Sequence, residues 1–208
     1  MENALLVGLS AQMALRRNME IIANNLANVS TAGFKREAPV FEELLVPVDA
    51  ADTSLSEVSF VRDLGVLRDM SPGSFEQTGS PLDVAVEGEA FLVVRTADGD
   101  RYTRDGHLKL DPQGRLVTSD GNPVMSDGGE ITVPPGETAI KIAADGTVST
   151  AQGTAGKMRV VSFLPGQLLK EGKNLYVADA DAQPEPAQNV RVLQGMIERS
   201  NVEPVVEM

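Results

Sequence analysis

Apolar side chains recur at helical spacing along the first thirty residues. The stretch from residue 3 to residue 30 contains no proline and a single glycine, Gly8. Its apolar positions follow steps of four and three residues, the spacing of a coiled-coil seam: Leu15, Met19, Ile22, Leu26 and Val29. The pattern predicts one long N-terminal α-helix of about 40 Å. Gly33, which closes a Ser-Thr-Ala-Gly run, is expected to end it.

This helix is expected to need a partner. Its apolar face is narrow, and burying that face does little more than offset the cost of ordering so long a backbone. We therefore expect a coiled-coil segment that is stable only when packed against another helix. Three residues of the segment, Asn24, Asn25 and Asn28, are poor helix formers. They either form an exposed polar face or donate amide hydrogen bonds between packed helices and fix the register.

Residues 36–80 follow a different pattern from the predicted helix, which with its ending occupies residues 1–35. Pro39, Pro47 and Pro72 interrupt this second stretch. Its apolar pieces, such as Val58–Val61, are short and have no sustained period. We expect an extended connector with one or two short strands.

Residues 81–186 show the alternation of strands. Leu82, Val84 and Val86 occupy alternate positions, and Phe91–Val94 is a compact apolar run. Five Asp-Gly pairs punctuate the stretch, each able to supply the positive φ of a tight hairpin. The pairs begin at Asp98, Asp105, Asp120, Asp127 and Asp145. The pattern predicts an antiparallel all-β module.

Residues 187–208 form a return segment and the start of a second helix. Val190–Met196 is apolar, and Ser200 with Glu203 has the spacing of a capping box before Pro204. About seven residues follow Asn201, which is too few for a stable isolated helix. The predicted fold class is therefore mainly β with a helical terminus.

Composition narrows the possible partners. The formal net charge is −12, so nucleic acid and anionic membrane surfaces are poor partners. The chain has no cysteine, which removes disulfides and thiolate chemistry, and no apolar run approaches the length of a membrane span or a signal peptide. With 4% aromatic residues, the core is expected to consist of aliphatic side chains.

Candidate chemistry is sparse. His107 stands beside an Asp-Gly turn without a nucleophile motif. Asp98, Asp100 and Asp105 are spaced like calcium ligands, but no glutamate closes a twelve-residue loop, so turn chemistry explains them better. We predict no catalytic, cofactor-binding or metal-binding residues and no small-molecule substrate. Two rival classes remain: a periplasmic β-domain binding module, and an acidic hydrolase with paired carboxylates.

Five segments together resemble one family. Ala23–Lys35 reads Ala-Asn-Asn-Leu-Ala-Asn-Val-Ser-Thr-Ala-Gly-Phe-Lys, and four further segments follow in order: Leu82–Gly88 leading to Phe91, Tyr102–Gly106, Gly114–Val117 and Gly195–Val202. These segments resemble the flagellar basal-body rod and hook family. The likeness covers nearly the whole chain.

The resemblance implies a structural role. Members of this family are rod subunits that assemble with copies of themselves and with other proximal- and distal-rod proteins into the shaft that transmits torque. It further implies passage through the flagellar type III export apparatus without a cleaved signal peptide, and a place in the rod crossing the periplasm. The short connector and Met70–Gly73 are most like the proximal-rod members, with the distal-rod members as the alternative.

The same resemblance gives a set of expected assembly residues. They lie in the predicted helix and in the segment that ends it. The set is Leu15, Met19, Ile22, Asn24, Asn25, Leu26, Asn28, Val29, Gly33 and Phe34. For Gly33 and Phe34, a simple helix stop with a hydrophobic contact is an equally good interpretation.

Overall fold

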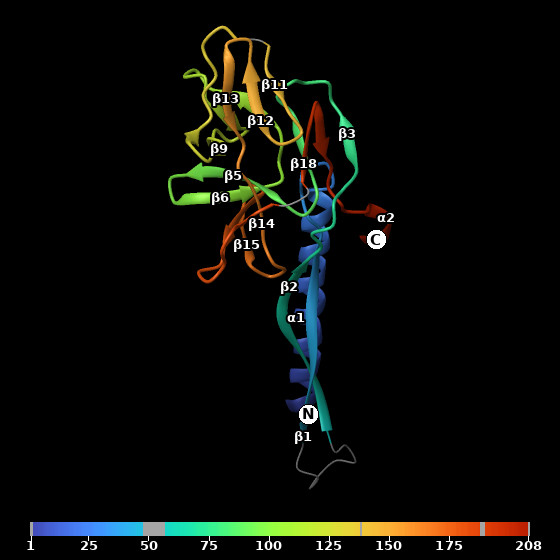
Figure 1. Ribbon diagram of the computed structural model, residues 1–208. Coiled ribbons are helices and arrows are strands. Elements are labelled where there is room, and N and C mark those ends of the chain that lie inside the picture. Colours follow the sequence, from blue (N-terminus) through green and yellow to red (C-terminus); the bar gives the residue numbers. More distant parts are fainter. Residues whose placement is uncertain (1, 48–56, 138, 188–189, 208) are drawn as a thin grey trace. The chain divides into compact units, whose positions relative to one another are not determined.

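The computed structural model describes residues 2–47, 57–137, 139–187 and 190–207 (Figure 1). The chain divides into two compact units. The helical unit takes in the described residues of Met1–Val29, Lys35–Asp69 and Val202–Met208. The β unit takes in Ser30–Phe34 and the described residues of Met70–Asn201. The predicted fold class, mainly β with antiparallel sheets and an N-terminal helix, is confirmed.

The helical unit is built from one long helix and a two-stranded ribbon. Helix α1 (Glu2–Ala27) has 26 residues, and at about 1.5 Å per residue it is close to the predicted length. Strands β1 (Glu37–Pro47) and β2 (Glu57–Arg68) pair antiparallel along their whole length and pack along α1 (Figure 1). A short helix, α2 (Pro204–Glu207), begins at the proline expected in its first turn.

The ribbon corrects two expectations. The predicted connector with short strands instead forms strands of 11 and 12 residues, although its portion at residues 48–56 lies outside the described residues. The long helix packs against this ribbon within its own chain, where a second helix was expected. Pro39 is accommodated because a two-stranded ribbon consists of edge strands, which tolerate a missing N–H.

The β unit holds the remaining strands. The largest sheet has six antiparallel strands in the order β15-β16-β6-β5-β14-β17, and β11-β12-β13 form a second sheet. Pairs β18-β4, β19-β3, β7-β8 and β10-β9 complete the unit. The bounds are β3 (Phe75–Gln77), β4 (Val84–Glu87), β5 (Phe91–Thr96), β6 (Gly99–Thr103), β7 (Leu108–Leu110), β8 (Leu116–Thr118), β9 (Met125–Ser126), β10 (Gly129–Glu130), β11 (Lys141–Ile142), β12 (Thr147–Thr150), β13 (Gly153–Lys157), β14 (Val160–Ser162), β15 (Leu168–Gly172), β16 (Leu175–Ala178), β17 (Glu185–Pro186), β18 (Arg191–Gln194) and β19 (Met196–Glu198).

These bounds extend the β unit beyond the expected limits of residues 81 and 186. Strand β3 lies before the predicted start, and β18 and β19 lie in the predicted return segment. Strand β18 pairs with β4, and β19 pairs with β3. Residues 188 and 189 of the return segment lie outside the described residues.

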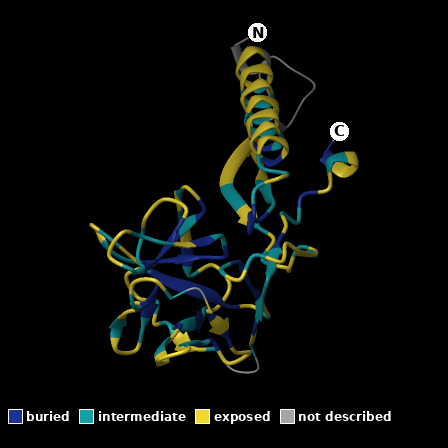
Figure 2. Ribbon diagram, turned by 90° about the horizontal axis from the view of Figure 1, so that it is seen from above, coloured by how far each residue is buried: buried dark blue, intermediate teal, exposed yellow. Residues whose placement is uncertain are grey.

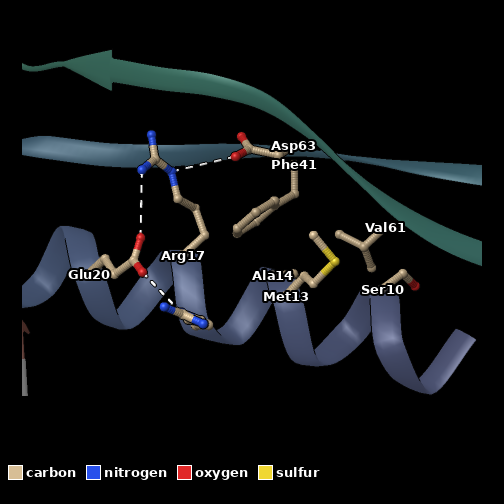
Figure 3. Close-up of a pocket in the computed structure, with 9 residues that line it drawn as sticks. Ser10, Met13, Ala14, Arg17, Glu20, Phe41, Val61 and Asp63 are labelled. Carbon is tan, nitrogen blue, oxygen red and sulfur yellow. Dashed lines mark hydrogen bonds and ion pairs between the residues drawn. The ribbon is translucent and has the colours of Figure 1, made fainter.

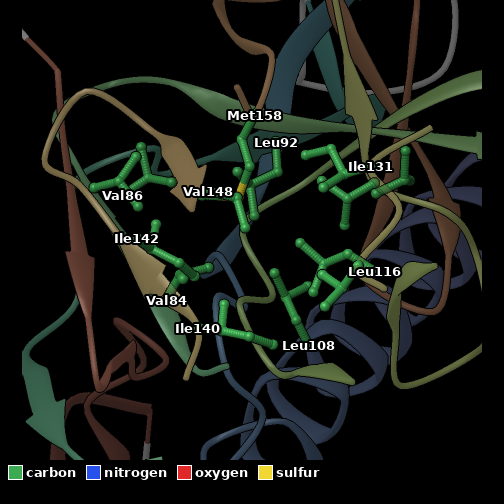
Figure 4. Close-up of a cluster of buried hydrophobic side chains, with 14 of the residues drawn as sticks. Val84, Val86, Leu92, Leu108, Leu116, Ile131, Ile140, Ile142, Val148 and Met158 are labelled. Carbon is green, nitrogen blue, oxygen red and sulfur yellow. The ribbon is translucent and has the colours of Figure 1, made fainter. Parts of the chain in front are cut away.

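Strand β5 is buried on both faces, which explains its continuous apolar run. Leu92 and Val94 enter one core cluster, whereas Phe91 and Val93 enter another. Successive side chains of a strand point to opposite faces, so the part of β5 that lies between two clusters, Phe91–Val94, is apolar at every position. Figure 2 shows β-unit strands in the buried colour, and Figure 4 shows the larger cluster around Leu92.

The two clusters differ in chemistry. The larger one is aliphatic, as composition predicts, and includes Leu116, Ile131 and Met158. The smaller one gathers the chain's two tyrosines, Tyr102 and Tyr176, with Phe91 and the partly buried Phe163. Their rings meet edge to face, with centroids 4.6 to 6.4 Å apart. Half of the chain's eight aromatic residues therefore lie in one cluster, which the composition could not show.

The Asp-Gly pairs confirm the turn prediction at three of five positions. Gly99, Gly121 and Gly146 have φ of 112°, 89° and 85°. At Asp127 the next glycine, Gly129, has the positive φ instead. Gly106 has no positive φ and is required for another reason, because a Cβ there would lie 1.6 Å from the Val84 carbonyl oxygen.

Removing a side chain from the larger cluster should destabilise the β unit. Leu92→Ala should lower the free energy of unfolding by about 2–5 kcal/mol, because it leaves a cavity in the larger cluster. Both tyrosines lie in the β unit, so tyrosine fluorescence during urea unfolding reports this unit selectively.

The matched control is Leu164→Ala, since Leu164 is exposed. We expect it to change stability by less than about 0.5 kcal/mol. Equal unfolding midpoints for the two variants would contradict the assignment of Leu92 to the core.

Candidate functional site

The buried face of α1 is centred on Ile21 and Asn25. Asn25 has no exposed surface. Its side-chain amide Nδ2 donates to the Glu37 carbonyl oxygen at 2.7 Å, and its Oδ1 accepts from the Glu37 N–H at 3.0 Å. The amide thus pairs with the first residue of β1 as another strand would, where a hydrogen bond to a second helix was expected.

The predicted seam faces away from this buried face. Leu15, Met19 and Leu26 are 65%, 70% and 43% exposed, while Ile22 and Val29 are half-buried. Residues 15, 19, 22 and 26 lie on one side of a helix, about a third of a turn from residues 21 and 25. The ribbon therefore leaves most of this apolar stripe uncovered.

Further apolar side chains are exposed near the helix N-terminus. Leu5, Leu6, Leu9 and Met13 are each about half exposed or more. The exposed apolar surface of α1 is therefore broad, and Figure 2 shows the helix largely in the exposed colour. Contiguous apolar surface of this kind marks an interaction site in a soluble protein.

A groove of about 400 Å³ lies between α1 and the ribbon (Figure 3). Met13, Phe41 and Val61 supply its apolar wall. At its charged end Arg17 lies 3.5 Å from Asp63 and 3.8 Å from Glu20. Arg17 therefore links the helix to β2 by an ion pair, although its exposure keeps the energetic contribution small.

A second ion pair holds α2 within the helical unit. The Arg36 guanidinium donates to the carboxylate of Glu207, a residue whose side chain is almost fully buried. Arg36 directly precedes β1, so the pair joins α2 to the start of the ribbon. Val205 and Val206 of this short helix are exposed, and Pro204 is half-buried.

The other expected assembly residues have separate surroundings. Asn24 is exposed, and its backbone carbonyl accepts from the Asn28 side chain at 2.8 Å at the end of α1. Gly33 and Phe34 are buried and belong to the β unit. Helix α1 ends at Ala27, so Gly33, with φ of 67°, lies well past the end that it was expected to form.

The candidate catalytic and metal-binding residues have structural surroundings. His107 Nδ1 lies 3.2 Å from Asp83 Oδ1, and the Asp105 carboxylate accepts the His107 backbone N–H. Asp98 occupies the β5–β6 turn, and Asp100 pairs with Arg95. Among the described residues, no group of three or more histidine, aspartate or glutamate side chains is placed to hold a metal ion. No helix in the described part of the chain is long and apolar enough to cross a membrane.

Burial changes the ionisation of two neighbouring residues. It raises the pKa of Asp105 above its usual value, against the lowering effect of the hydrogen bond from the His107 N–H. It also lowers the pKa of Arg104, an effect that the nearby Glu198 carboxylate opposes. Arg104 and Glu198 are both almost completely buried and lie 3.4 Å apart.

Comparison with known proteins connects these features to one family. The model "Flagella basal body rod protein" matches residues 5–35, and the model "Flagellar hook protein FlgE/F/G D1 domain" matches residues 85–150. The flagellar basal-body rod protein FlgF of Caulobacter vibrioides is 43% identical, and the match covers 100% of this chain and 86% of that protein.

Two further relatives show the breadth of the family. FlgF of Salmonella typhimurium is 34% identical over 100% of this chain and 86% of that protein. FlgG of Buchnera aphidicola is 36% identical over 97% of this chain and 85% of that protein. These matches define a structural protein of the flagellar rod and hook class. Within that class, the chain belongs to the flagellar basal-body rod protein family and is FlgF-like, with its place in the flagellar basal body.

Replacing Asn25 should loosen the junction between α1 and β1. Asn25→Ala removes both hydrogen bonds to Glu37, each contributing about 1 kcal/mol. Hydrogen exchange at the Glu37 amide should become roughly thirtyfold faster, the factor that corresponds to about 2 kcal/mol. Asn24→Ala is the matched control because the Asn24 side chain is exposed. If both variants exchange at the wild-type rate, the Asn25–Glu37 pairing is wrong.

Proposed function

We propose that this chain is a proximal-rod subunit that assembles helically with copies of itself and with other rod proteins. In this arrangement the exposed stripe of α1, formed by Leu15, Met19 and Leu26, packs against helices of neighbouring subunits. Ile22 and Val29 form the edge of the same contact. The assembled shaft transmits torque for motility.

The observation that carries this proposal is the exposure of the seam residues. A seam at steps of four and three residues is the pattern that fits another helix, because each side chain enters a space between residues of its partner. The ribbon covers a different face of α1, so the seam remains available. A contact that repeats with a rotation that does not close gives a filament.

The proposal includes the route and place of the subunit. We infer export through the flagellar type III apparatus without a cleaved signal peptide, and a position in the rod where it crosses the periplasm. The absence of cysteine suits an oxidising compartment. We infer no enzymatic activity, since the family is structural and His107 and the turn aspartates have structural partners.

A distal-rod position is the second candidate. Its support is the 36% identity to FlgG of Buchnera aphidicola, which is comparable with the identity to FlgF of Salmonella typhimurium. The 43% identity to FlgF of Caulobacter vibrioides favours the proximal position.

A charge placed in the seam should block assembly and leave the subunit folded. Leu26→Asp and Met19→Asp should each abolish incorporation into isolated basal bodies, because a carboxylate cannot be buried between apolar helices without a partner. Urea unfolding of the β unit, followed by tyrosine fluorescence, should keep its wild-type midpoint.

The control is Leu164→Asp, which makes the same change at an exposed leucine of the β unit. This variant should be incorporated normally and support motility. Normal incorporation of the two seam variants would count decisively against a seam contact. If only Leu164→Asp failed to be incorporated, the assembly surface would lie on the β unit instead.

A further inference from the structure

A five-residue segment of the chain, Ser30–Phe34, belongs to the β unit although both of its sequence neighbours belong to the helical unit. We call it the latch. The preceding residues end at Val29 and the following ones begin at Lys35. The chain therefore enters the β unit for five residues and leaves it again, which no helix or strand requires, since the latch itself is irregular.

The β unit holds the latch through its backbone. Asn174 Nδ2 donates to the Ala32 carbonyl oxygen at 2.6 Å, and the Gly33 N–H donates to the Glu198 carbonyl oxygen at 2.8 Å. Ala32, Gly33 and Phe34 are all buried. Buried backbone groups need such partners, so these two bonds are required for the latch to stay in place.

Side-chain shape adds to this hold. Gly33 lies so close to the backbone of Arg104 that a Cβ would meet the Arg104 carbonyl carbon at 2.5 Å. The Phe34 ring is 2% exposed, and Lys170 Nζ lies 4.3 Å from its centroid. Only glycine fits at position 33, both because a Cβ would clash with Arg104 and because the backbone has a positive φ there.

The residues that hold the latch are themselves fixed. Arg104 donates to the carbonyl oxygens of Val86 and Gly88, and Glu198 accepts the Gly73 N–H through its side chain at 3.0 Å. Asn174 lies in the left-handed region with φ of 58°, beside Lys173 with φ of 49°. Such a conformation costs free energy in a residue with a side chain, and here it aims the Asn174 amide at the latch.

We propose that Ser30–Phe34 acts as a latch whose docking on Asn174, Glu198 and Arg104 orders the end of α1 and the start of β1. Two residues separate the latch from the end of α1 at Ala27, and two separate it from the start of β1 at Glu37. When it is docked, Val29 and Lys35 follow immediately from a fixed backbone. When it is released, the last turn of α1 and the first residues of β1 lose that anchor. This inference does not depend on rod assembly and concerns the single subunit.

A matched pair of glycine substitutions at the β15–β16 turn isolates the latch contact. Asn174→Gly keeps the positive φ and removes the bond to Ala32, whereas Lys173→Gly relieves the same strain at an exposed neighbour. Hydrogen exchange of the purified full chain is the measurement. Asn174→Gly should speed exchange of residues 28–37 roughly ten- to hundredfold, and Lys173→Gly should leave it unchanged.

A second pair tests the close approach at Gly33. Gly33→Ala meets the Arg104 backbone, whereas Gly79→Ala has a similar φ of 73° and nothing within 4 Å of its Cβ. Gly33→Ala should accelerate exchange of residues 28–37 more than Gly79→Ala does. If Gly33→Ala fails to fold, the comparison of Asn174→Gly with Lys173→Gly still tests the proposal.

Two results would overturn the proposal. One is faster exchange in Asn174→Gly confined to the β15–β16 turn, with residues 28–37 as in the wild type. The other is the same acceleration in Lys173→Gly, which would make turn strain, and not the bond to Ala32, the cause. Basal-body incorporation is not measured in this test, so its result is independent of the assembly proposal.

Discussion

The helical unit depends on one constraint: α1 carries more apolar surface than its own chain covers. The β1–β2 ribbon buries the face around Ile21 and Asn25, which lets the helix form within the subunit. The stripe through Leu15, Met19 and Leu26 stays in contact with solvent. Exposed leucine and methionine at coiled-coil spacing gain free energy when another helix covers them, and this gain is the driving force for the assembly we propose.

In the β unit, by contrast, the apolar side chains of the central strand are covered within the unit itself. Strand β5 has a cluster on each face, so its apolar run is fully covered without a partner. A buried ion pair, Arg104–Glu198, lies where the unit holds the Ser30–Phe34 latch. Burying two charges is costly unless other bonds satisfy them, and two backbone carbonyl groups accept from the terminal nitrogens of Arg104, while its Nε has no hydrogen-bond partner among the described residues. One unit is thus complete by itself, and the other leaves apolar surface for a neighbour.

The spacing of apolar residues along the sequence predicted the elements whose buried faces repeat at a regular interval. The steps of four and three residues gave α1, and the run at Phe91–Val94 gave a buried strand. The ribbon was missed because Pro39 and Pro47 read as breaks in a connector, while a two-stranded ribbon has room for proline at its edges. The five-residue return to the β unit was missed as well, because Gly33 reads equally well as a helix stop. Contacts such as Asn25–Glu37 and Asn174–Ala32 join residues that no local pattern relates.

Chemical labelling of a single introduced thiol tests the seam most directly, because the natural chain has no cysteine. Met19→Cys places a thiol on the exposed stripe of α1, and Leu164→Cys places one on the exposed surface of the β unit. Both should react with a maleimide in the free subunit. In isolated basal bodies we predict that Cys at position 19 is protected while Cys at position 164 still reacts. Equal reactivity at position 19 before and after assembly would contradict a seam buried between neighbouring helices.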